Sequence, residues 1–120
     1  MWRRAVYRFV VRSVPNPFME SLDCADPNIN TPVRNTTITA LQALAIFNDT
    51  FVLRQSEYLA ERLRRARPDV DGQIGLACRL ALGRRPKADE RRALTDYAQR
   101  YGLANACRVI LNMNEFIFVD

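Results

Sequence analysis

The stretch TTITALQALAIFND, residues 36–49, carries the clearest structural pattern in the chain. Its apolar residues recur at helical spacing, and either Thr37 or Thr39 can cap the start of a helix. The buried face of that helix is expected to consist of Leu41, Leu44, Ala45 and Phe47. Asn48-Asp49 interrupts the pattern, and Asp49 is a favourable N-cap for a second helix. The stretch therefore predicts two consecutive helices joined at one polar break.

The helix that follows Asp49 is predicted to run to about residue 66, and three more follow it. Their expected stops and caps are Pro68, Asp69 or Asp71, Gly83 and Gly102. The last two helices then span about residues 87–101 and 103–113. Short connections around Pro68 and residues 83–86 favour αα-hairpins. The chain is therefore predicted to be all-α, with about five short helices in αα-hairpins.

Each of these later helices has an apolar face that should form the core. The expected core residues are Phe51, Val52, Tyr58, Leu59, Leu63, Ile74, Ala77, Cys78, Ala81, Leu82, Leu94, Tyr97, Ala98, Tyr101, Cys107, Ile110 and Leu111. A free cysteine on such a face behaves as a small hydrophobe. The alternative for Cys78 and Cys107 is a disulfide, if the chain is exported. Cys24 lies in a loop and is expected to be structural or incidental.

The N-terminal part is a basic segment followed by an arm rich in Pro, Asn and Asp, together residues 1–34. Residues 2–13 combine a helical apolar stripe with strand-forming valines, so both helix and strand stay open, with helix favoured. Apolar residues from Phe18 to Ile29 indicate that the arm packs on a surface. We expect one helical domain over residues 1–120, with its helical core over residues 35–120.

The net charge of the chain is +5, and every basic residue except Lys87 is an arginine. The charges are spread along the whole chain without a recognition motif, so no specific nucleic acid is expected as a partner. Arg8 and Arg12 interrupt any signal-peptide core. No apolar run approaches the roughly 20 residues of a transmembrane helix.

The chain contains no histidine. This absence excludes Ser-His and Cys-His nucleophile pairs within the chain, and it removes the commonest metal ligand. None of the three cysteines is in C-x-x-C spacing, so a zinc site is not expected. No catalytic residue, metal site or cofactor site is therefore assigned to this chain.

Amides and acids gather at the helix ends and form the one candidate polar cluster. Its members are Asn35, Gln42, Asn48, Asp49, Asn112, Asn114 and Glu115, with Asp120 at the end of the chain. If the helix ends converge, Asp49 and Glu115 could form a carboxylate pair for acid–base work or a cation site. The alternative, which we favour, is that these side chains cap orphan backbone groups.

Several segments together resemble a known family. They are Arg3-Arg4 through Tyr7, RNT at 34–36, LQAL at 41–44, Asn48-Asp49, LALGRRP at 80–86, Glu90, and LNMNEF at 111–116 with Val119-Asp120. Their order resembles the C-terminal part of a domain of unknown function that ends large planctomycete and verrucomicrobial proteins, many of which begin with a cytochrome c domain. The resemblance is strongest at LQAL and at the last segment. It implies that the chain is the C-terminal fragment of a longer protein.

The resemblance also implies an exported, periplasmic, multidomain parent protein. Haem would belong to that parent only, because no residue here matches the part that binds it. The expected role is a non-catalytic module that docks against upstream domains of the same protein or against a protein partner. The alternatives are a fragment of an enzyme acting on polysaccharides, with catalytic residues partly outside this chain, and a basic nucleic-acid-binding domain.

The chain departs from the family pattern at two helix starts. Thr50 replaces the proline that the family tends to have after Asn-Asp. Lys87 stands where the family tends to have Thr or Ser three residues before Glu90. Because Lys87 cannot supply a capping oxygen, the capping box is predicted to be lost, which leaves Glu90 only the helix dipole to serve.

Overall fold

The computed structural model describes residues 39–117, in which every regular element is a helix. In chain order these are α2 (Ala40–Asn48), α3 (Thr50–Ala66), α4 (Val70–Ala81), α5 (Ala88–Tyr101), α6 (Leu103–Leu111) and α7 (Asn114–Ile117). The all-α prediction is confirmed. The arm, the helix-or-strand alternative over residues 2–13, Cys24, Asn35 and Asp120 lie outside the described residues.

The helices begin where the sequence supplies a capping oxygen. The Thr39 hydroxyl accepts a hydrogen bond from the Gln42 amide at 3.2 Å, and the Gln42 side chain accepts one from the Thr39 amide at 3.0 Å. Asp49 accepts from the Phe51 amide at 2.7 Å and so starts α3. Asp69 accepts from the Gly72 amide at 2.6 Å and starts α4. The predicted caps Thr39, Asp49 and Asp69 are therefore confirmed.

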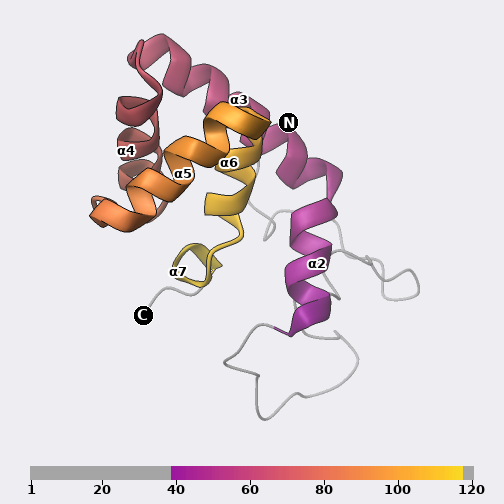
Figure 1. Ribbon diagram of the computed structural model, residues 1–120. Coiled ribbons are helices and arrows are strands. Elements are labelled where there is room, and N and C mark those ends of the chain that lie inside the picture. Colours follow the sequence, from indigo (N-terminus) through magenta and orange to yellow (C-terminus); the bar gives the residue numbers. More distant parts are fainter. Residues whose placement is uncertain (1–38, 118–120) are drawn as a thin grey trace, which may run out of the picture.

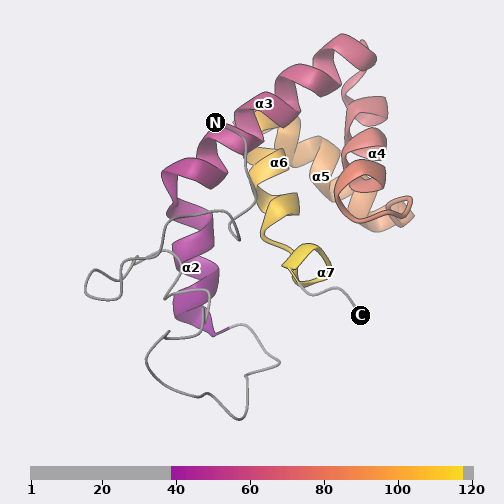
Figure 2. The same ribbon diagram turned by 180° about the vertical axis from the view of Figure 1, so that it is seen from behind.

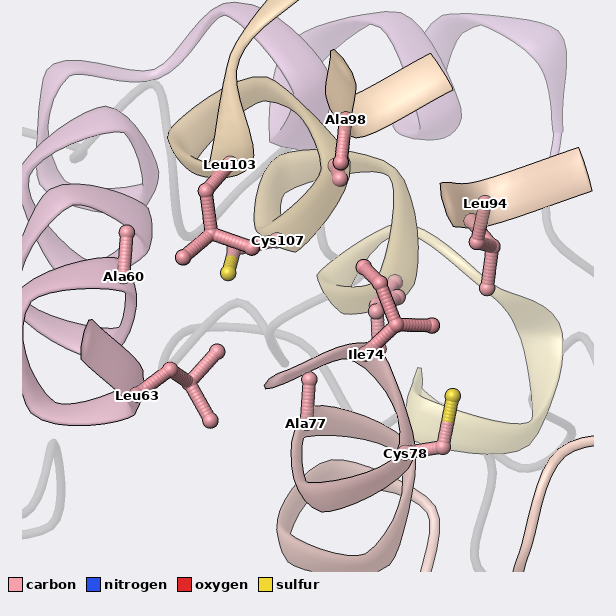
Figure 3. Packing of buried hydrophobic residues seen from close by; sticks show 11 residues of the cluster. Ala60, Leu63, Ile74, Ala77, Cys78, Leu94, Ala98, Leu103 and Cys107 are labelled. Carbon is pink, nitrogen blue, oxygen red and sulfur yellow. The ribbon is translucent and has the colours of Figure 1, made fainter. Parts of the chain in front are cut away.

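Helix α6 lies at the centre of the bundle, packed against α3, α4, α5 and α7 (Figures 1 and 3). The buried cluster around it consists of Ala60, Leu63, Ile74, Ala77, Cys78, Leu94, Ala98, Leu103, Ala106, Cys107 and Ile110. Ala60 of α3 and Ala106 of α6 are both fully buried in this cluster. The hairpin neighbours α3–α4 and α4–α5 also pack on each other, as predicted.

Helix α2 projects away from this bundle, and its main contact is with α3 (Figures 1 and 2). The predicted burial of Leu41 and Leu44 is wrong, because their exposed fractions are 72% and 59%. Ile46 is the buried residue of this helix, at 6% exposed. The difference arises because only the C-terminal part of α2 reaches the bundle, so its first turns have no covering helix among the described residues.

Three aromatic residues assigned to the core are also exposed. The exposed fractions of Phe51, Tyr58 and Tyr101 are 58%, 54% and 61%. In α3 the side covered by the bundle carries Val52, Ser56, Ala60 and Leu63, and the aromatic residues lie on other sides of the helix. The predicted helix over 103–113 also ends earlier, at Leu111, and the short helix α7 follows it from Asn114 to Ile117.

None of the helices within residues 39–117 combines the length and the apolar character that crossing a membrane requires.

Candidate functional site

The predicted polar residues lie at two separate helix joints. Asn48 and Asp49 form the joint between α2 and α3, and Gln42 lies one turn into α2. Asn112, Asn114 and Glu115 surround the turn from α6 to α7. Each joint is held by one arginine, Arg108 in the first case and Arg84 in the second. Neither arginine belongs to the set predicted from the sequence.

Arg108 of α6 closes the C-terminal end of α2. Its Nε donates to the Phe47 carbonyl at 2.5 Å, and its Nη2 donates to Asn48 Oδ1 at 3.0 Å. The guanidinium carbon also lies 3.8 Å from the centre of the Phe47 ring, a cation–π contact. Helix α2 has no basic residue in its own last turn. Arg108 therefore supplies the positive charge that a helix C-terminus favours.

Arg84, in the connector between α4 and α5, binds two carboxylates at once. Its Nη1 and Nη2 donate to the two oxygens of Glu90 at 2.8 and 3.1 Å. Its Nε and Nη2 donate to Oε2 of Glu115 at 2.9 and 2.7 Å. These bonds raise the pKa of Arg84 above its ordinary value. The guanidinium thus joins the start of α5 to α7 through fork-like, charge-assisted hydrogen bonds.

Glu90 accepts hydrogen bonds both from Arg84 and from the Lys87 amide. Its hydrogen bonds from Arg84, followed by the bond from the Lys87 amide, lower its pKa, while partial burial opposes them. The Lys87 amide donates to Glu90 Oε2 at 3.1 Å, so half of the capping box persists. The prediction that Glu90 serves only the helix dipole is therefore wrong. Lysine at position 87 removes the capping-box hydrogen bond that needs a side-chain acceptor, but its backbone amide still donates to Glu90.

The remaining amides, Asn48, Asn112 and Asn114, lie at the ends of helices. Asn48 Nδ2 donates to the Leu44 carbonyl at 3.0 Å. Asn112 is the C-cap of α6, and its Oδ1 is buried without a hydrogen-bond partner in the described part of the chain. Asn114 is the first residue of α7. A ligand-binding role for the seven candidate residues stays a prediction, and Asn35 lies outside the described residues.

The chemistry open to these joints is limited by how their groups are already used. Asp49 is engaged as a helix cap, and Glu115 is engaged by Arg84. Burial raises the pKa of the Cys107 thiol to about 12, and burial is also the main cause that raises the pKa of Cys78. Both cysteines are free and buried. Within residues 39–117, no group of three His, Cys, Asp or Glu residues could hold a metal ion. The arrangement fixes helices relative to one another.

Both arginines bind partners that lie far away along the chain. Arg84 lies inside LALGRRP, one of the segments that carry the family resemblance. Its partner Glu115 is 31 residues away, however. Arg108 and Asn48 are 60 residues apart, and no local spacing rule connects them. Helical periodicity finds neighbours three or four residues apart and misses such pairs.

Comparison with known proteins identifies a family of proteins. Residues 1–98 match the family model PSD1, which is described as a protein of unknown function (DUF1553). None of the curated proteins and none of the solved structures matches the chain. The matched residues end within α5, so α6 and α7 lie beyond the match. Since the match covers most of the 120 residues, the chain belongs to this DUF1553 family of proteins of unknown function.

Proposed function

We propose that this chain is a non-catalytic docking module of a larger exported protein, and that α2 packs against another domain of that protein. The observation that carries the proposal is the exposure of Leu41 and Leu44 on a helix without a single charged side chain. The resemblance to the C-terminal part of cytochrome-c-associated proteins supports the location and the kind of parent. Haem would be bound elsewhere in that parent.

The energetic argument concerns the first turns of α2. Burying a leucine side chain contributes about 1.5–3 kcal/mol relative to leaving it exposed. Leu41 and Leu44, at 72% and 59% exposed, keep most of that free energy available for a partner. They are three residues apart and therefore share one side of the helix. A solvated helix normally places charged residues on its outer side, and α2 has none there.

The docking helix is also ordered before any partner arrives. The Thr39–Gln42 capping box fixes its start, and Arg108 fixes its end. A binding element that is already folded avoids the entropic cost of ordering on association. This preorganisation favours a role in recognition over a role as a linker.

The alternative, that this chain is a fragment of an enzyme, can be tested by substitution of Asp49. Asparagine caps helices about as well as aspartate, so Asp49→Asn should leave the fold intact. Loss of a polysaccharide-degrading activity of the longer protein in this variant, with an unchanged melting curve, would support catalysis. An unchanged activity would favour capping as the role of Asp49.

The docking proposal is tested by photo-crosslinking in the complete protein within its own cells. A photoreactive residue at position 44 should give one discrete crosslink, mapped by mass spectrometry to another domain of the same polypeptide. The matched control is position 80, because Leu80 is also an exposed leucine, at 45%, but lies on α4. Equal, scattered crosslinking from both positions would contradict the proposal.

A further inference from the structure

Helix α7 is attached to the bundle by few contacts. It has four residues, Asn114–Ile117, and none of them is buried. The amides of Phe116 and Ile117 both donate to the Met113 carbonyl, at 2.9 and 3.3 Å. A helix of this length is unstable by itself, because its hydrogen bonds do not offset the entropy lost in ordering one turn. The position of α7 therefore depends on the contacts that it makes with the rest of the chain.

The ion pair between Arg84 and Glu115 ties α7 to the connector between α4 and α5. Two donor–acceptor distances join the side chains, at 2.9 and 2.7 Å, and the Glu115 side chain is 57% exposed. An ion pair that is open to water contributes little to stability. Glu90 is held more firmly, because Arg84 binds both of its oxygens and its side chain is only 20% exposed. Glu115 is therefore the weaker of the two attachments to Arg84.

The turn that leads into α7 contains an unpaired buried acceptor. Oδ1 of Asn112, the C-cap of α6, is buried and has no hydrogen-bond partner in the described part of the chain. A buried carbonyl oxygen without a partner costs free energy, because it has given up its hydrogen bonds to water. Opening of the turn would return this oxygen to water. The closed arrangement is thus disfavoured at the residue about which α7 would move.

The thiol of Cys78 lies near the place where α7 is held. Cys78 is fully buried on α4, and its sulfur points toward the pale yellow ribbon of the C-terminal segment (Figure 3). Burial is the main cause that raises the pKa of Cys78, and the charges of Glu90, Arg84 and Glu115 act on it as well. The thiol is therefore close to the ion pair that holds α7. Movement of α7 would open a path from solvent to Cys78.

Cys107 provides an internal comparison. It is also free and fully buried, but it lies on α6, which packs against α3, α4 and α5. Burial raises its pKa to about 12, and the arginine that acts on it is Arg64 of α3 rather than Arg84. Movement of α7 leaves these neighbours in place. Cys107 should therefore become accessible only when the bundle itself opens.

We propose that α7 is a latch that opens and closes while the bundle stays folded, with the Arg84–Glu115 ion pair as its catch and the turn at Asn112 as its hinge. In the closed state α7 shields the Cys78 thiol. In the open state this thiol is accessible, and the core between α3 and α6 is unchanged. Local opening is typical of segments with few buried contacts. The latch is independent of the proposed docking of α2, whose main contact is with α3.

Thiol labelling measures the opening of the latch. The complete protein is treated with N-ethylmaleimide under native conditions, and peptide mass spectrometry follows the modification of each cysteine separately. When α7 closes faster than the reagent reacts, the labelling rate follows the population of the open state. Cys78 should be modified roughly tenfold faster than Cys107, or more. Equal rates would mean that both thiols become accessible only when the bundle unfolds, and would overturn the inference.

Two substitutions should move the latch in opposite directions. Glu115→Ala removes the catch and should raise the labelling rate of Cys78 roughly two- to fivefold, as expected for loss of an exposed ion pair. Asn112→Leu removes the unpaired acceptor, keeps a side chain of similar size and should lower that rate at least about fivefold. Neither substitution should raise the labelling rate of Cys107.

The matched control is Asp96→Ala. It breaks the ion pair of Asp96 with Arg100 on α5, and the Asp96 side chain is 56% exposed, nearly the same as that of Glu115. The control should leave the labelling rates of both buried cysteines unchanged. An unchanged Cys78 rate in Glu115→Ala, an equal rise at Cys107, or a faster Cys78 rate in Asn112→Leu would overturn the inference.

Discussion

Replacing Arg108 with methionine should release the C-terminal end of α2 while leaving the bundle folded. The change removes a charge-assisted hydrogen bond to the Phe47 carbonyl, a weaker exposed bond to Asn48 and a cation–π contact with the Phe47 ring. Methionine keeps part of the contact with the ring, because its thioether packs favourably against aromatics. The substitution therefore isolates the polar part of the joint.

The cost follows from the three contacts. A hydrogen bond to a charged group contributes about 1.5–3 kcal/mol, and the partly buried bond to Phe47 falls at the lower end of that range. The exposed bond to Asn48 and the cation–π contact each contribute about 0.5 kcal/mol. After the methionine contact is subtracted, the net loss is about 2 kcal/mol. This loss corresponds to roughly 30-fold more opening of α2.

Hydrogen exchange read by mass spectrometry measures this opening directly. Amides of residues 44–48 should exchange roughly 30-fold faster in Arg108→Met, while amides of α3 and α6 keep their wild-type rates. The control is Arg100→Met, which removes only an exposed pair with Asp96 and should change exchange by less than about threefold. Unchanged exchange in α2, or equal acceleration in both variants, would refute the idea that Arg108 holds this joint.

Three further predictions concern the bundle itself. Gly102→Ala should lower the free energy of unfolding by about 1–3 kcal/mol, because the φ angle of +93° suits only glycine. Gly75→Ala, where the added methyl group meets no other atom, should raise it by about 0.5–1 kcal/mol. Thermal melts measure both changes, and equal effects would be inconsistent with the backbone argument. Because the folded pKa of Glu90 is lowered from 4.5, its stabilising contribution is complete above that pH and is lost as the pH falls below it. Chemical unfolding of Glu90→Gln should therefore depend less on acid than that of the wild type, and parallel curves would count against the Arg84 bond. Cys107, whose pKa is raised from 9.0 to about 12, should react with a disulfide reagent at about pH 8 only when the protein unfolds. Its contribution to stability should be lost as the pH rises above 9.0, because the thiol of the unfolded chain then ionises while the buried thiol does not. Immediate reaction of the folded protein would disprove the burial of Cys107.

Local sequence chemistry predicted the helices well because the signals that start and stop a helix are themselves local. A capping oxygen acts on amides two or three residues away, as at Thr39 and Asp49. Likewise Gly102 ends α5 because its own φ angle of +93° suits glycine. These features need no knowledge of the rest of the fold.

Burial was harder to predict, because periodicity marks an apolar side without showing whether anything covers it. Leu41 and Phe51 belong to apolar helical patterns like those of the buried residues, yet both are exposed. Conversely Ser56 is buried, at 2% exposed, on the covered side of α3, and its hydroxyl donates to the Leu53 carbonyl at 2.7 Å in its own helix. The amides and acids at the helix ends indicated where the polar joints lie. The arginines that bind them could not be predicted, because those contacts form only when helices that are distant in the sequence assemble.

The central place of α6 has a consequence for synthesis of the chain. Helix α3 is made first, but the side of it that carries Ala60 and Leu63 is covered by α6, which is translated about 40 residues later. On the ribosome, α3 to α5 must therefore wait with an open apolar surface until Ile110 has emerged. A pause of translation before α6 would therefore prolong the exposure of this apolar surface and, with it, the risk of aggregation.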